Sequence, residues 1–175
     1  MKIDRTPALT RAAPARLLCL LALCASAGGA QAASCSVSFP ATINLGVYNT
    51  VNALQPAPWT FTVTCTRTVG GGQSETVSLR SFFSVGSGTF ANRTLRGSPV
   101  PDTLNYNLFA DAAYTQVRGD GSGGTFVGGP VTLTLTAANP TQQASGQVYA
   151  RVPGGQNVAP GTYSTTAPVV ISITF

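Results

Sequence analysis

Trp59-Thr60-Phe61-Thr62-Val63-Thr64-Cys65-Thr66 alternates strictly between one face of Trp, Phe, Val and Cys and a second face of threonines. Successive side chains of a β-strand point to opposite faces, so this period of two predicts a strand that is buried on one side only. Similar alternation occurs in the segments 35–39, 76–79, 104–108, 131–136, 146–152 and 169–175. The chain is therefore predicted to be built from strands.

The connections between these segments are rich in turn-forming residues. Glycine and proline gather at 70–72, 119–124, 128–130, 153–155 and 160–161, which are typical turn positions. No window of a dozen residues after residue 32 has the 3.6-residue period of an amphipathic helix. About eight short strands with such turns predict an all-β sandwich made of one domain.

The first 32 residues have the pattern of a secretory signal peptide. A basic segment is followed by the short apolar run 17–25 and then by Ala30-Gln31-Ala32, a typical cleavage sequence. We predict a signal peptide at 1–32 and a domain at 33–175; lipid attachment at Cys24 is a weaker alternative, because the bulky Leu23 precedes it. The mature chain is expected to be exported and to lack a membrane-spanning segment.

Two cysteines, Cys35 and Cys65, remain after removal of the signal. Two thiols in an exported chain are expected to form a disulfide, which would close a loop of about 30 residues. Two free buried thiols would be unusual in an oxidising compartment. A metal site is disfavoured because the chain has no histidine.

Catalysis and nucleic-acid binding have little support in the composition. The predicted mature chain has six scattered arginines, no lysine and four separated acids, for a formal charge of +2. The missing histidine rules out Ser-His and Cys-His pairs, and no basic stripe with interleaved aromatic residues is present. We therefore predict no enzyme activity, no cofactor, no metal and no nucleic-acid partner.

The last predicted strand carries the apolar row Val169, Ile171, Ile173 and Phe175. At the edge of a sheet, such a strand would invite pairing with another chain, because nothing in its sequence blunts the edge. In the centre of a sheet, it would be an ordinary core strand. The alternation alone does not distinguish the two positions.

The order of several short motifs resembles the spore coat protein U domain family, which includes subunits of archaic, Csu-type chaperone–usher pili. The motifs are Cys35, Leu45-Gly46-Val47-Tyr48, Val63-Thr64-Cys65, the segment 104–111, Gly119-Asp120-Gly121, the segment 149–153, Gly161-Thr162-Tyr163 and the segment 170–175. The resemblance implies an immunoglobulin-like sandwich that is incomplete and lacks its final strand. Val169, Ile171, Ile173 and Phe175 would then form one edge of an acceptor groove for a strand from another chain.

The resemblance also implies partners and a location. A periplasmic chaperone, an outer-membrane usher and neighbouring pilus subunits would bind the chain on its way through the periplasm to a surface fibre. The expected function is that of a fibre subunit that supports surface attachment or biofilm. The alternative is a self-contained secreted coat or surface-binding protein that does not polymerise.

One feature departs from the family pattern. Polymerising subunits carry a donor segment of some ten or more residues before their first cysteine. Cleavage before Ala33 would leave only Ala33 and Ser34 ahead of Cys35. The sequence therefore predicts a chain that receives a strand and does not donate one.

Overall fold

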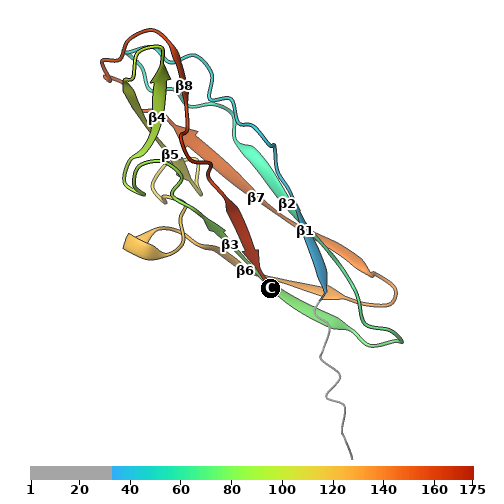
Figure 1. Cartoon of the computed structure of the whole chain (residues 1–175). Coiled ribbons are helices and arrows are strands. Elements are labelled where there is room, and N and C mark those ends of the chain that lie inside the picture. Colours follow the sequence, from blue (N-terminus) through green and yellow to red (C-terminus); the bar gives the residue numbers. More distant parts are fainter. Residues whose placement is uncertain (1–32) are drawn as a thin grey trace, which may run out of the picture.

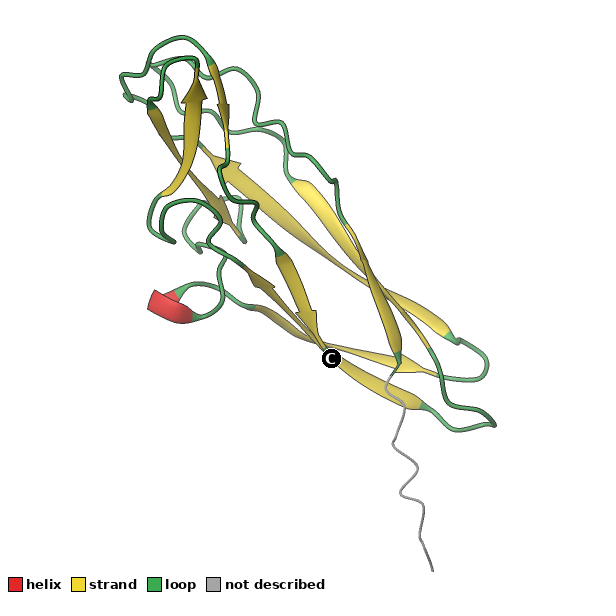
Figure 2. Ribbon diagram, viewed as in Figure 1, coloured by secondary structure: helices red, strands yellow, loops and turns green. Residues whose placement is uncertain are grey.

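The computed structural model describes residues 33–175, and the predicted signal peptide at 1–32 lies outside the described residues. Nine strands form in this part of the chain: β1 (Ser34–Ser38), β2 (Trp59–Thr66), β3 (Glu75–Phe83), β4 (Arg93–Ser98), β5 (Thr103–Phe109), β6 (Gly128–Leu135), β7 (Thr141–Arg151), β8 (Thr162–Ser164) and β9 (Ile171–Thr174). A single 3-10 turn, η1 (Ser122–Gly124), lies between β5 and β6 (Figure 2).

The strands form two antiparallel sheets that pack as a sandwich (Figure 1). The larger sheet has the order β1-β2-β7-β5-β4-β8, and the smaller one has the order β6-β3-β9. The predicted all-β sandwich is therefore confirmed. Strands far apart in the sequence pair directly: β2 pairs with β7, and β3 pairs with β9.

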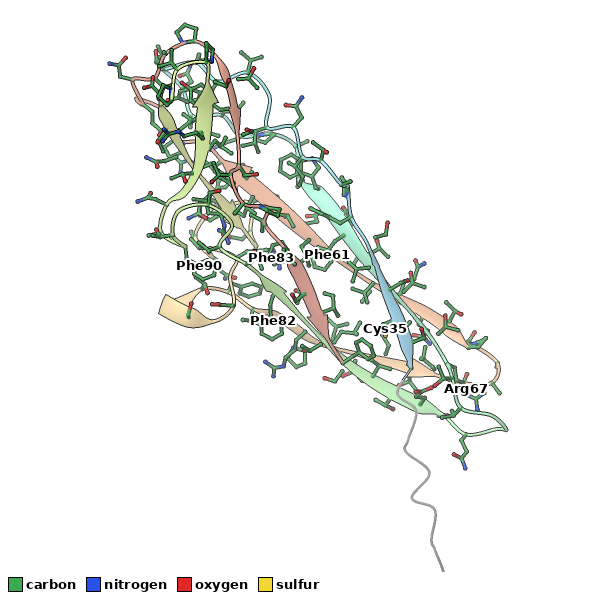
Figure 3. All side chains as sticks on the ribbon, viewed as in Figure 1. Cys35, Phe61, Arg67, Phe82, Phe83 and Phe90 are labelled. Atoms are coloured by element: carbon green, nitrogen blue, oxygen red, sulfur yellow. A yellow bond between two sulfur atoms is a disulfide. The ribbon has the colours of Figure 1, made fainter. Side chains whose placement is uncertain are left out.

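The alternation that predicted β2 is the pattern of burial in the structure. Phe61, Val63 and Cys65 are buried between the sheets, and the threonines between them face outward or are half-buried. Phe61 meets Phe83 of β3 edge to face, with ring centroids 6.0 Å apart (Figure 3). Paired aromatic rings of this kind join the two sheets across the core.

Two strands, β4 and β8, have no counterpart among the segments that alternation predicted. β8 is only three residues long, too short for a period to be visible. β4 places Arg93 at a buried position, where an apolar residue would have completed the pattern. Hydrophobic periodicity therefore does not predict β4, because a cation occupies one of its buried positions.

Arg93 is fully buried and is held by main-chain and amide oxygens. Its guanidinium donates to the carbonyls of Ser84 (3.1 Å), Val85 (3.0 Å) and Arg118 (2.8 Å), and to Oδ1 of Asn107 (2.5 Å). Burial lowers the pKa of Arg93, although a guanidinium stays protonated at neutral pH. The buried charge thus fastens the segment after β3 and the segment around Arg118 to the core.

Candidate functional site

β9 lies at the edge of the smaller sheet. It pairs with β3 alone, in a register that joins Thr174 to Arg80 and Ile171 to Phe83. No other strand of the described chain pairs with its second edge. Of the two positions that the sequence allowed for this strand, the structure has the edge position.

The apolar row of β9 faces the core but is only partly covered. Val169, Ile171 and Ile173 are half-buried against the core cluster, and Phe175, just after the strand, is 54% exposed. By contrast, the inward row of the neighbouring β3 is buried and ends at Phe83, which is 1% exposed. The core is therefore closed at β3 and incompletely covered at β9.

β1 is also an edge strand, in the larger sheet; the remaining edge strands of the described chain are β8 in that sheet and β6 in the smaller one. β1 pairs only with β2, in a register that sets Cys35 opposite Cys65 and Val37 opposite Val63. The predicted disulfide is present between Cys35 and Cys65 and fastens β1 to β2. Cys35 and Phe39 are half-buried against the core, and Val37 is 43% exposed.

Two of the four edge strands, β1 and β9, reach the same end of the sandwich. In Figure 1, β1 begins and β9 ends toward the same end of the molecule. Both strands carry apolar side chains that the described chain leaves partly uncovered. The sequence predicts only the β9 row as an acceptor edge. The alternation of Cys35, Val37 and Phe39 with serines in the segment 35–39 is the signal for the apolar row of β1.

Residues 21–170 match the Spore Coat Protein U domain. The chain belongs to the Spore Coat Protein U domain family. The predicted resemblance is therefore confirmed, and this family is associated with exported chaperone–usher pilus and coat proteins. A search of curated proteins found no match.

The four acids of this Spore Coat Protein U domain serve local hydrogen bonds. Asp111 accepts from the main-chain N–H groups of Thr115 and Gln116, and Asp120 accepts from that of Ser122. The pKa of Asp111 is lowered first by the Gln116 N–H and then by the Thr115 hydroxyl, and the pKa of Asp120 is lowered first by the Ser122 hydroxyl and then by the Ser122 N–H. The remaining two acids also accept main-chain N–H groups, Glu75 from Thr68 and Asp102 from Ala159.

Within residues 33–175, no three side chains of His, Cys, Asp or Glu gather in a way that could hold a metal ion. The same residues include no helix with the length and apolar character needed to cross a membrane. Arg118 forms a bridge with Phe126, and Asp120, two residues later, also accepts from the Ser122 hydroxyl.

Proposed function

We propose that this chain is a structural subunit of an exported surface fibre and is completed by a β-strand from another chain. The observation that carries the proposal is the free edge of β9, whose inward apolar row is left half-covered. A strand added there would continue the order β6-β3-β9 by one position. Its inward side chains would cover Ile171 and Ile173 from the side that β3 does not reach.

The physical basis is strand addition to an open sheet edge. The unpaired main-chain N–H and C=O groups of β9 supply regularly spaced hydrogen bonds for an incoming strand, and alternate side chains of that strand fill the space between the sheets. Natural proteins usually blunt long apolar edges with charge, proline or a covering element. Ser172 and Thr174, the outward residues of β9, carry no charge that would oppose pairing.

In this proposal, one side of the acceptor groove is formed by Val169, Ile171, Ile173 and Phe175. The other side is formed by Cys35 and Val37 of β1 and by Phe39, which directly follows β1. A periplasmic chaperone would supply the strand first, an outer-membrane usher would export the subunit, and a neighbouring subunit would replace the chaperone's strand. The role is structural, with surface attachment or biofilm as its outcome, and involves no catalysis.

The test is co-expression with a periplasmic chaperone of the chaperone–usher class, followed by affinity purification of the chaperone. We expect the wild-type chain to co-purify. Ile173→Asp places a charge in the inward row and is expected to abolish co-purification. Thr174→Asp, one residue away on the outward face of the same strand, is the matched control and should retain it.

Purification of the chain without a chaperone gives the second measurement. An incomplete sandwich should unfold at a lower denaturant concentration alone than in its complex with the chaperone. If the chain is instead monomeric and cooperatively stable alone, and no chaperone captures it, the strand-receiver function is wrong. That result would favour a self-contained coat or surface-binding protein.

A further inference from the structure

Arg118 is a second buried cation, and it lies between the two sheets, where the proposed strand pairing does not use it. Its side chain is 5% exposed. Nε and Nη2 both donate to the carbonyl of Gln147 in β7, at 3.2 and 2.6 Å. The guanidinium carbon lies 4.9 Å from the ring centroid of Phe83 and 5.5 Å from that of Phe61.

One nitrogen of this guanidinium has no partner. Nη1 is buried and has no hydrogen-bond acceptor anywhere in residues 33–175. Arg93, the other buried arginine, differs in that oxygen atoms accept from all three of its nitrogens. Aromatic faces stabilise a cation, but they do not replace the acceptor that a buried charged N–H group requires.

Arg118 lines a cavity of about 200 Å³ between the sheets. Its lining includes small residues from two strands, Gly128 on β6 and Ala144 and Gly146 on β7. A Cβ atom placed on Gly128 would lie 3.3 Å from Nη1 of Arg118 and 2.2 Å from Oγ of Ser81. Two side-chain donors, a guanidinium and a hydroxyl, therefore meet beside the bare backbone of Gly128.

The other walls of the cavity are mostly apolar. They are formed by Phe61, Val63, Leu79, Phe126, Val131 and Ile173. Val131 is 44% exposed, so it stands at the side of the cavity that is open to solvent. The lining thus combines an apolar chamber with two donors at one point, which is the usual composition of a small-molecule site.

We propose that this cavity binds a small apolar carboxylic acid, with its carboxylate at Nη1 of Arg118 and at the Ser81 hydroxyl. The carboxylate supplies both the missing acceptor and the missing negative charge, since no acid forms an ion pair with Arg118 within residues 33–175. The apolar body of the acid contacts Phe126 and Val131. A neutral ligand of the same shape would leave the buried charge without a counter-ion.

The test uses isobutyrate as the probe and isobutyramide as its uncharged counterpart, added to the purified oxidised protein and followed by NMR. We expect isobutyrate to shift the amide signals of Ser81 and Gly128 saturably, with a dissociation constant on the order of 1 mM. The amide should bind at least about tenfold more weakly, because it lacks the charge-assisted hydrogen bond.

Two variants locate the site. Arg118→Gln removes the charge and should weaken isobutyrate binding by at least about tenfold. Val131→Phe fills the open side of the cavity and should block binding, whereas Val170→Phe enlarges a 53% exposed valine away from it and should not. Urea unfolding of each variant shows whether it is folded, and Val131→Phe with the amide comparison decides the question if Arg118→Gln does not fold.

The proposal is wrong if isobutyrate causes no saturable shift up to about 50 mM, well above the expected dissociation constant. It is also wrong if the amide binds equally well, or if Val131→Phe binds isobutyrate as the wild type does. Ile173 belongs to both the cavity and the acceptor row. The amide comparison and the Val131→Phe variant are measured without a chaperone, so a failure of this site is distinguishable from a failure of the proposed fibre function.

Discussion

The disulfide between Cys35 and Cys65 offers the sharpest quantitative prediction, because β1 is otherwise held from one side only. Its five residues pair with β2, from Ser34 opposite Thr66 to Ser38 opposite Thr62, and no strand of the described chain covers its other edge. Reduction breaks the S–S bond and removes no side-chain heavy atom. It therefore isolates what the covalent link contributes.

The magnitude follows from the length of the closed loop. The two cysteines are 30 residues apart, and the loop-closure model assigns about 3.7 kcal/mol to a loop of that size. Total stabilities of single domains are about 5–15 kcal/mol, so the link accounts for a large share. For a domain of this size, a loss of 3.7 kcal/mol lowers the melting temperature by about 10–15 °C.

The assay is urea unfolding with and without a phosphine reductant, followed by tryptophan fluorescence. Trp59, at the start of β2, is the chain's single tryptophan and reports on the strand to which β1 is attached. Hydrogen exchange of the β1–β2 amides should show β1 opening before the rest of the sandwich once the bond is reduced. Free energies of unfolding that agree within about 1 kcal/mol in the two states would refute the loop-closure reasoning.

Two further predictions concern neighbouring residues with opposite environments and a local pH effect. Phe83→Ala removes a ring that is 1% exposed and should lower the free energy of unfolding in urea by about 3–5 kcal/mol. Phe82→Ala, on the half-buried opposite face of β3, is the matched control and should lower it clearly less. Equal losses would contradict the assigned faces. The pKa of Asp111 is lowered first by the Gln116 N–H and then by the Thr115 hydroxyl, so the carboxylate stabilises its turn above about pH 4, and this stabilisation is lost as the pH falls through the lowered pKa. An NMR titration of the Gln116 amide should show that low midpoint and lose it in Asp111→Asn; a midpoint at or above about pH 4 in the wild type would contradict the assignment.

Local periodicity was sufficient for much of the fold. The alternation at 59–66 corresponds to β2 residue for residue, and the threonine face is the less buried one. The pairing of Cys35 with Cys65 followed from the two cysteines that remain after the predicted signal peptide, and the structure contains that bond. The alternation depends on side chains within one strand, and two cysteines allow only one pairing. Both features can therefore be predicted without a three-dimensional structure.

The larger arrangement depended on contacts between distant segments. The row Val169, Ile171 and Ile173 looks the same in sequence whether its strand lies at an edge or in the centre, because alternation describes one strand and says nothing about how many neighbours it has. Only the pairing of β9 with β3 alone made it an edge. The cavity beside Arg118 is likewise lined by residues from different strands, among them Gly128 and Gly146.

The sequence by itself determined that this chain forms strands, that the strands pack as a sandwich and that two cysteines join. The tertiary structure decided which strand edges stay open and that two arginines are buried in the core. The physical reason is that alternation and composition are properties of neighbouring residues. An open edge or a cavity is a property of residues brought together by folding, such as Ile173 and Arg118, which line one cavity although they come from different parts of the chain.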